Sequence, residues 1–487
     1  MSEILPIKVP PEMKIHVLSE DKIEKIHQTT LKVLEEVGIK FPSQKALEIF
    51  KDNGAKVDFK NEIVRIPEEV LMKSLSKAPK EYTMASSRNE TELDLYLDGT
   101  KTFYGTDGTG TTTVDLKTRE KRRSQKSDIE MMAIISDYLS SISFYWPVVS
   151  AQDMPSSIIP LHEIEASFNN TEKHVHIISC IEEEMAKYAV EMATIVRGSR
   201  RLLRERPPLS LLVCTVAPLA QDKGALEAAL VFAEAGLPVG FMAMPTVAST
   251  SPASLASNIV VGNAEVLSAL SLIQLAYPGA PVYYSYLPEM LNPHTGGIFD
   301  SAYQKPLLYA AGVDLGHYYN IPVMAYYGAT GSKSPDRWIT GKDNAIDALF
   351  VTLTGPDLLP SMGLLDAYTL LYPEKILFDD EIFRSIKNIT EGILVNDNTL
   401  AYNEIREVGP GGHFLNREYT KTNLRRLWEV GITNQWSPEI NDFTDFYKVA
   451  QEKINWILLN HKVKPLDDKI KIELKQIIKK AEKQFEQ

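Results

Sequence analysis

Aromatic side chains gather near the ends of several short apolar runs in this sequence. A group of such rings can hold a quaternary ammonium, because the cation lies against the ring faces and gains about 0.5–2 kcal/mol when water is excluded. Aromatic residues also pack strands against helices, and alternation sends only about half of them to either face of a strand. The ring-bearing candidates for substrate binding are Tyr104, Tyr145, Trp146, Tyr284, Tyr286 and Tyr327.

Two acidic residues accompany these rings. Asp107 lies in the glycine-rich segment GTDGTGTTTVD, and Glu289 follows the tyrosine-rich segment PVYYSYL. Three glycines near a strand end allow a tight turn and a close approach of the backbone to a ligand. Each carboxylate could position a cationic substrate, or it could simply cap a turn, and both readings stay open.

Two histidines stand two residues apart, at His174 and His176, and on a strand they would share one face. Together with Cys180 or Cys214 they would offer the nitrogen and sulfur ligands that Zn²⁺ prefers. The spacing is generic, however, and no paired-cysteine motif accompanies it. We therefore expect hydrogen-bonded core histidines and no metal site, with His176 as a candidate for substrate contact.

The loop VGPGGHFL near the C-terminus is the sharpest local motif. Its three glycines and one proline allow a backbone that folds tightly over a site and presents His413 and Phe414. A glycine-rich loop can bind phosphate at a helix N-terminus, but no helix signal follows at once here. We expect His413 to position the substrate and Phe414 to contact it.

Helices and strands have to position these candidates, and the chain shows a repeated pattern that predicts such elements. A short apolar run followed by a helical stretch recurs eight times, and the runs do not alternate with polar residues, as expected for strands buried on both faces. Eight such units over about 250 residues are typical of a (β/α)8 TIM barrel, whose chemistry lies at the C-terminal ends of the strands. The runs are 102–107, 142–153, 173–180, 209–218, 239–248, 281–289, 321–328 and 359–365.

The fold class is therefore α/β, with additions at both ends of the barrel. Residues 1–100 contain two amphipathic helix signals, each ended by a glycine, and short strand signals, which predict an α+β cap. Residues 101–395 hold the barrel. Residues 396–487 hold the glycine-rich loop and a helical extension whose last part is rich in lysine and glutamate.

Composition excludes several classes of protein. The net charge of −12 argues against a nucleic-acid binder, which needs a basic face for phosphate contacts. The first residues lack the apolar core of a signal peptide, and the apolar runs are too short to span a membrane. Two cysteines imply no disulfide framework, so we expect a cytoplasmic protein.

Three segments resemble a known family. The tail GPGGHFLNREYTKTNLRRLWEVGITNQWSPE, the segment GATGSKSPDRW and the segment GLLDAYTLLYPEKILFDDEI look like those of the trimethylamine methyltransferase superfamily, and the similarity covers nearly the whole chain. Archaeal trimethylamine enzymes of this superfamily carry pyrrolysine. Every position here is a standard residue, so the chain resembles the non-pyrrolysine branch.

The resemblance implies a quaternary amine:corrinoid methyltransferase of one-carbon metabolism. Glycine betaine is the first expected methyl donor, with proline betaine and carnitine as alternatives, and trimethylamine is not expected. The methyl acceptor would be Co(I) of a separate corrinoid protein that docks on the barrel mouth, so this chain itself would hold no cofactor tightly. The carboxylate of a betaine needs cations or N–H donors, for which Lys333, Arg337 and His413 are the candidates. A homo-oligomer is also expected, because exposed barrel helices often pair.

Two other functions remain as alternatives. The first is a metal-dependent TIM-barrel enzyme that uses His174, His176 and a cysteine, for which a stoichiometric metal in purified protein would be the evidence. The second is a non-catalytic betaine-binding protein, which would bind a ligand but would never transfer its methyl group.

Overall fold

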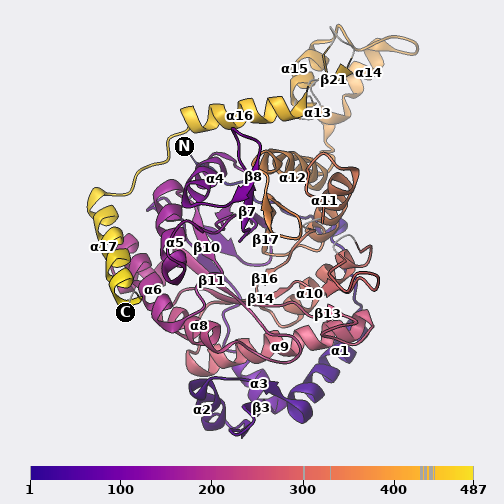
Figure 1. Ribbon diagram of the computed structural model, residues 1–487. Helices are drawn as coiled ribbons and strands as arrows, with labels where there is room; N and C mark the ends of the chain where they lie inside the picture. The colour runs from indigo at the N-terminus through magenta and orange to yellow at the C-terminus, as the bar shows by residue number, and fades with distance from the viewer. Residues whose placement is uncertain are drawn as a thin grey trace.

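The structure is a computed structural model that describes residues 2–299, 302–328, 331–427, 432, 436–437, 442–443 and 445–485. Eight parallel strands close into a barrel, and Figure 1 shows helices arranged as a ring around them. Every one of the eight predicted runs contains or overlaps a barrel strand, so the predicted (β/α)8 class is confirmed. The strands are β6 (Phe103–Thr106), β9 (Phe144–Tyr145), β10 (His174–Ile177), β11 (Leu209–Cys214), β12 (Val239–Ala243), β14 (Val282–Tyr286), β16 (Val323–Met324) and β17 (Leu358–Met362).

One helix or more follows each strand and covers the outer face of the barrel. Several of these helices begin at a side chain that accepts a backbone N–H, as Asp222 and Ser254 do, because the first turn of a helix leaves its N–H groups without partners. The ring consists of α4 (Lys126–Tyr138), α5 (Ile159–Asn170), α6 (Glu183–Arg197), α8 (Lys223–Ala235), α9 (Leu255–Ala276), α10 (Lys305–Tyr318), α11 (Trp338–Thr352) and α12 (Lys375–Glu391), with the short η3 (Ser156–Ile158) and α7 (Arg200–Glu205) between them.

Helix α9 is apolar on nearly every side because it is covered on nearly every side. It packs against β12 and β14 of the barrel and against α1, α2 and α3 of the N-terminal region. By length and composition it could cross a membrane, and it is the single such helix in the described chain, but 83% of its most apolar window is buried inside the protein. The pattern is that of a core helix.

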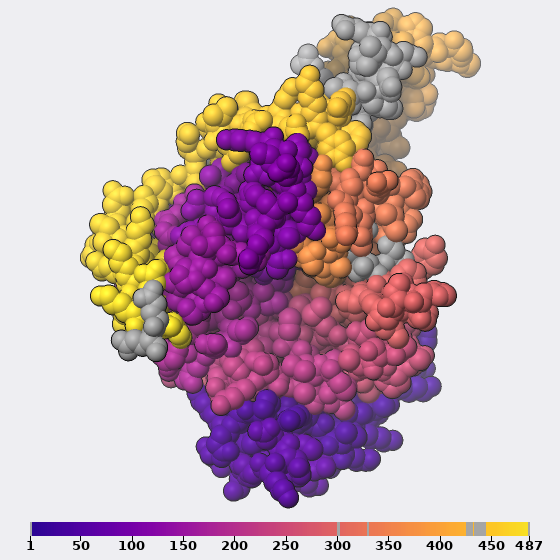
Figure 2. All heavy atoms as spheres, viewed as in Figure 1, coloured from indigo at the N-terminus to yellow at the C-terminus, as the bar shows by residue number. Residues whose placement is uncertain are grey.

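The N-terminal region forms the expected α+β cap. After η1 (Pro11–Met13), it contains α1 (Glu20–Lys32), η2 (Val33–Val37), α2 (Gln44–Asp52) and α3 (Glu68–Leu75), with an antiparallel sheet of β1 (Ile39–Lys40), β3 (Ile63–Arg65) and β2 (Lys56–Asp58). Figure 2 shows this cap, in indigo, as a layer on one side of the molecule. The cap therefore covers the α9 side of the barrel.

A hairpin of β4 (Tyr82–Met84) and β5 (Leu95–Leu97) continues from the cap to the N-terminal end of the barrel. There the Tyr82 hydroxyl donates to the carbonyl of Val282, at the start of β14, and the Ala85 N–H donates to the carbonyl of Pro207, just before β11. The bottom of the barrel is thus in contact with this hairpin, and the opposite end is the candidate opening.

Short strands lie at the C-terminal end of the barrel. A four-stranded sheet, in the order β18 (Leu364–Leu365), β19 (Leu370–Leu371), β7 (Thr112–Val114) and β8 (Lys121–Arg123), is built from the loops that follow β17 and β6. In the loops that follow β12 and β14, β13 (Thr246–Val247) pairs with β15 (Glu289–Met290). We call this end of the barrel the mouth.

The C-terminal residues leave the barrel and return to it. Helices α13 (Asp397–Leu400), α14 (Tyr402–Val408) and α15 (Glu418–Leu427) form a projection that we call the arm, residues 396–427 (Figure 1). The strands β20 (Trp436–Ser437) and β21 (Asp442–Phe443) follow, then α16 (Phe446–Asn460) packs on α4, and α17 (Asp468–Phe485) packs on α5 and α6.

Candidate active site

Three neighbouring strands bring three polar side chains together at the mouth. Asp107 follows β6, Trp146 follows β9 and His176 lies in β10, and these strands are adjacent in the barrel. The rings of Trp146 and His176 meet edge to face, with centroids 4.8 Å apart. The indole edge that carries Nε1 lies against the backbone of Gly108, where a Cβ would be only 2.3 Å from it. We call Asp107, Trp146 and His176 the mouth cluster.

Each member of the mouth cluster is buried and carries one polar atom that no described residue satisfies. These atoms are Asp107 Oδ2, Trp146 Nε1 and His176 Nε2. Buried polar groups in folded proteins are almost always hydrogen-bonded, because leaving one unmade costs about 1–3 kcal/mol. Three such atoms on adjacent strands therefore mark a place where a ligand or ordered water completes the structure.

The Asp107 carboxyl is buried and has a raised pKa. Its Oδ1 accepts the Gly108 N–H at 2.9 Å. Burial raises its pKa from 3.8 to about 7; the negative charge of Asp379 adds to this rise, while the Gly108 N–H and the Lys375 cation oppose it. A cation placed against Oδ2 would hold the carboxyl ionised, because opposite charges favour the charged form.

The histidine pair is held by hydrogen bonds. His174 has both ring nitrogens engaged, Nδ1 with the Ala85 carbonyl at 2.9 Å and Nε2 with Ser210 Oγ at 2.8 Å. His176 Nδ1 lies 2.8 Å from the same Ser210 Oγ. His174 therefore has no lone pair to offer a metal, and in the described chain no group of three His, Cys, Asp or Glu side chains is placed to hold one. The alternative of a metal-dependent enzyme therefore lacks His174, the first of its proposed ligands.

The opposite wall of the barrel interior is aromatic. The rings of Tyr283 on β14 and Tyr326 after β16 are buried and interact electrostatically with each other and with Cys214. Tyr283 also interacts with Tyr82 at the bottom of the barrel, and Tyr326 interacts with Asp107. The Tyr283 ring fits against Gly240, where a Cβ would be 1.8 Å from it. Cys214, at the end of β11, is partly exposed.

Tyr368 reaches the mouth from a strained turn. Asp366, Ala367 and Tyr368 all have positive φ, at 52°, 51° and 66°. Non-glycine residues in this region cost about 1–3 kcal/mol each and persist where the surroundings impose them, commonly at functional sites. The Tyr368 hydroxyl is buried, has no hydrogen-bond partner among the described residues, and interacts electrostatically with Asp107 and Glu289.

Two buried ion pairs lie beside the mouth. Lys305 Nζ is 2.7 Å from Glu289 Oε2, and Lys375 Nζ is 2.8 and 2.7 Å from the two Asp379 oxygens. Glu289 was predicted as a positioning residue, and the structure gives it a lysine partner. Both lysines are therefore already neutralised by protein carboxylates.

Four of the predicted substrate-binding tyrosines face the helices, so the expectation that they line the mouth is corrected here. Tyr145 donates to the Ile129 carbonyl in α4 at 2.9 Å. Tyr284 and Tyr286 donate to side-chain oxygens of α9, those of Asn263 and Asn258. Tyr104 is hydrogen-bonded to Thr352 at the end of α11 and packs edge-on against Phe383 of α12.

The reason is the period of the strand. Side chains alternate between faces, so a one-residue error exchanges the two sets. In β14 the inward tyrosine is Tyr283, whereas the prediction selected Tyr284 and Tyr286. Tyr327 follows the same rule: its N–H donates to Ser361 Oγ, and its ring lies beside that of Tyr104 with centroids 6.1 Å apart, on the helix side of the wall.

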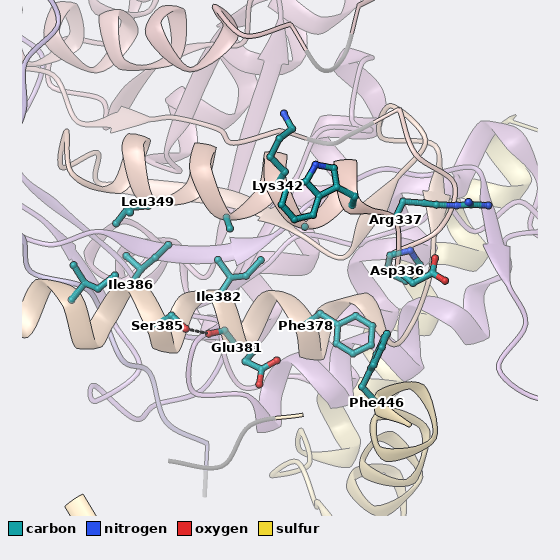
Figure 3. A pocket seen from close by; sticks show the side chains of 15 residues that line it. Asp336, Arg337, Lys342, Leu349, Phe378, Glu381, Ile382, Ser385, Ile386 and Phe446 are labelled. Atoms are coloured by element: carbon teal, nitrogen blue, oxygen red, sulfur yellow. Dashed lines mark hydrogen bonds between the residues drawn. The ribbon is translucent and has the colours of Figure 1, made fainter. Parts of the chain in front are cut away.

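The charged and loop candidates lie outside the barrel interior. Lys333 is exposed and 3.8 Å from Asp366. His413 and Phe414 are exposed on the arm. Arg337 is exposed at one end of an outer groove of about 560 Å³ between α11 and α12, where Figure 3 shows it pointing away from the apolar side chains. The structure does not bring these four residues to the mouth cluster.

Sequence reasoning missed Tyr283, Tyr326, Tyr368, Lys305 and Lys375 as residues of the mouth. The first two stood in segments already singled out for their tyrosines, and the alternation of the strand was the available signal. Lys305 carried no signal, because its partner is 16 residues away. Lys375 and Asp379 stand at i,i+4 in a helical segment, a spacing that was the available signal for their pairing.

The chain matches a family of known proteins over nearly its whole length. The family model described as trimethylamine methyltransferase (MTTB) matches residues 3–486. The chain is 31% identical to the trimethylamine methyltransferase MttB of Desulfitobacterium hafniense (strain DSM 10664 / DCB-2), covering 96% of this chain and 94% of that one. It is 29% identical to the glycine betaine methyltransferase of Desulfitobacterium hafniense (strain Y51), covering 98% of both chains. The MttB of Methanosarcina barkeri (strain Fusaro / DSM 804) is 29% identical over 97% of this chain and 96% of its own.

These relatives are named as methyltransferases, and the family model covers the cap, the barrel and the C-terminal helices. The resemblance that the three sequence segments indicated is thereby confirmed. This chain is a methyltransferase that belongs to the trimethylamine methyltransferase (MTTB) family.

Proposed function

We propose that this protein transfers a methyl group from a small quaternary ammonium compound to Co(I) of a separate corrinoid protein. The observation that carries the proposal is Asp107 Oδ2, a buried oxygen without a hydrogen-bond partner among the described residues. The Trp146 ring packs against the next residue, Gly108, and Tyr326 is close enough to interact with Asp107 electrostatically. Membership of the family supplies the reaction class. Glycine betaine, proline betaine and carnitine are the candidate methyl donors with which we begin.

The chemistry asks little of the protein beyond binding and orientation. Co(I) supplies the nucleophile when the corrinoid protein is docked, and the methyl carbon loses its bond to nitrogen as it gains one to cobalt. The electron pair of the C–N bond stays on nitrogen, which leaves as a neutral tertiary amine without needing a proton. The chain's own task is to hold the cation, exclude water and aim one methyl group out of the barrel.

The residues present fit this task. The Asp107 carboxylate offsets the ammonium charge, and aromatic ring faces stabilise a cation that has lost its water by up to about 2 kcal/mol. Gly108 and Thr109, beside Asp107, are partly exposed, so the methyl group can be reached from the C-terminal end of the barrel. We therefore place corrinoid docking on the mouth, over the sheet β18-β19-β7-β8.

Binding and transfer test the proposal separately. Calorimetry should show that glycine betaine, proline betaine, carnitine or choline binds with micromolar to millimolar affinity, and that dimethylglycine and trimethylamine bind more weakly. Purified protein mixed with chemically reduced cob(I)alamin and the bound donor should then form methylcobalamin, followed by absorbance. Failure of every quaternary amine to bind would overturn the proposal, and binding without transfer to any corrinoid would favour a binding protein.

A further inference from the structure

We propose that Trp146 and His176 bind a hydroxyl group of the substrate, so that the methyl donor belongs to the class of β-hydroxy quaternary ammonium compounds. In this class, which includes choline and carnitine, the hydroxyl is two carbons from the ammonium nitrogen. The inference rests on the proposed function of the mouth and deepens it by assigning the two polar atoms that the cation itself does not use.

The tautomer of His174 is set by a backbone carbonyl. The Ala85 carbonyl oxygen can only accept a hydrogen bond, so Nδ1 of His174 must carry the proton of that 2.9 Å contact. Burial lowers the pKa of His174 to about 4, so the ring is neutral at physiological pH and its Nε2 holds a lone pair. The hydroxyl of Ser210, 2.8 Å away, must therefore donate to Nε2.

The Ser210 hydroxyl in turn determines which nitrogen of His176 carries the proton. A serine hydroxyl has one proton, and here it is used on His174, so Ser210 Oγ can only accept from the Nδ1 of His176 at 2.8 Å. Burial and the neighbouring His174 hold the pKa of His176 well below its usual range, so this ring is neutral as well. With its single proton on Nδ1, His176 presents a lone pair at Nε2. The mouth cluster thus contains a hydrogen-bond acceptor where a histidine could have offered a donor.

Trp146 supplies the complementary donor. An indole Nε1–H can only donate, and its ring meets that of His176 at 81° with centroids 4.8 Å apart. Within the described residues neither Trp146 Nε1 nor His176 Nε2 has a partner, and both side chains are at most 2% exposed. A hydroxyl group satisfies both atoms, because its oxygen accepts from the indole while its proton goes to the imidazole.

A carboxylate fits this place poorly. It has no proton for His176 Nε2, so its oxygens would face the imidazole lone pair. The buried lysines beside the mouth are already paired, Lys305 with Glu289 and Lys375 with Asp379, and Arg119 is paired with Glu374. A carboxylate at Trp146 would therefore meet no uncommitted cation among these three residues, while the hydroxyl needs none.

The matched probes are choline and ethyltrimethylammonium, which differ only by the hydroxyl. Calorimetry on the full-length protein should give choline an affinity about tenfold higher than that of ethyltrimethylammonium, the gain expected when one ligand hydroxyl satisfies two buried polar atoms. In Trp146→Phe, which keeps an aromatic ring but lacks the N–H, this ratio should fall to about threefold or less. In His176→Phe it should fall similarly.

Tyr145→Phe is the control variant, because the Tyr145 hydroxyl faces α4 and lies one residue from Trp146. Its choline preference should equal that of the unmodified protein. Thermal unfolding checks that each variant is folded, and if a Phe variant fails to fold, the unmodified protein still decides the question through the two probes alone.

The outcomes separate this inference from the proposed function. If ethyltrimethylammonium and choline bind equally well to the unmodified protein, the two atoms are satisfied by water and the hydroxyl inference is overturned, while a quaternary amine site stands. If glycine betaine binds better than choline, the inference is also overturned, and the Trp146 N–H then binds the carboxylate of the substrate. If no quaternary amine binds, it is the proposed function that fails.

Discussion

Lys305 and Glu289 form an ion pair at 2.7 Å beside the barrel mouth, and the two side chains are only 2% and 3% exposed. Removing one partner of a buried pair leaves an uncompensated charge, which destabilises a protein by about 3–5 kcal/mol. We expect Glu289→Gln to lower the free energy of unfolding by that amount, measured by denaturant unfolding. The exposed pair of Arg201 and Glu205 is the control, and Glu205→Gln should change stability by less than about 1 kcal/mol. Equal effects of the two substitutions would contradict the buried-pair interpretation.

Asp107→Asn should weaken the binding of quaternary amines and abolish its dependence on pH. A bound cation needs the ionised carboxylate, and burial raises the pKa of Asp107 to about 7 in the free protein. Affinity in the unmodified protein should therefore fall as the pH drops below 7, approaching tenfold per pH unit. Calorimetric Kd values between pH 5.5 and 8 measure this, and an Asp107→Asn protein with the same pH profile would show that the charge lies elsewhere.

The same substitution should stabilise the free protein at alkaline pH. The folded pKa of Asp107 is raised above the unfolded value of 3.8, so the folded state binds the proton more tightly and stability is lost as the pH rises through the interval from about 4 to 7. The asparagine side chain would carry no charge into the buried site. Thermal melts at pH 8 should show a higher Tm for Asp107→Asn than for the unmodified protein. The corresponding gain in the free energy of unfolding should be on the order of 1 kcal/mol or more. A lower Tm would mean that the ionised carboxyl has a stabilising partner in the free protein.

Tyr284→Phe separates the outward rings from the inward ones. Its hydroxyl donates to Asn263 Oδ1 in α9, so its loss should cost about 1 kcal/mol of stability and leave the Kd of a quaternary amine unchanged. Tyr326→Leu is the comparison variant, because it removes a ring from the aromatic wall and should weaken amine binding. A change in Kd for Tyr284→Phe larger than that for Tyr326→Leu would reverse the assignment of faces.

His413→Ala should leave amine binding untouched, because His413 is exposed on the arm. The informative measurement pairs Kd with methyl transfer to a corrinoid protein. Unchanged Kd with unchanged transfer places the loop outside both steps, and unchanged Kd with slower transfer assigns it to docking of the partner. Weaker amine binding would show that the loop containing His413 closes over the barrel mouth.

The sequence by itself determined the architecture. Eight apolar runs, each followed by a helix signal, predicted every barrel strand, because a strand buried on both faces must be apolar along its whole length. The cap helices ending at Gly38 and next to Gly54 were found for an equally local reason, since helix ends carry their own signals. Asp107, Trp146 and His176 were among the candidates because chemistry in this fold lies at strand ends.

Tertiary structure decided which side chains face the mouth and which partners they meet there. Tyr283 points inward while Tyr284 and Tyr286 point outward, and composition cannot reveal this because all three are tyrosines in one apolar run. The lone pair on His176 depends on Ala85, a residue far earlier in the chain that reaches the barrel floor from the cap. Local pattern fixes an element, but the direction of a side chain and the proton it carries are set by contacts between segments that only folding brings together.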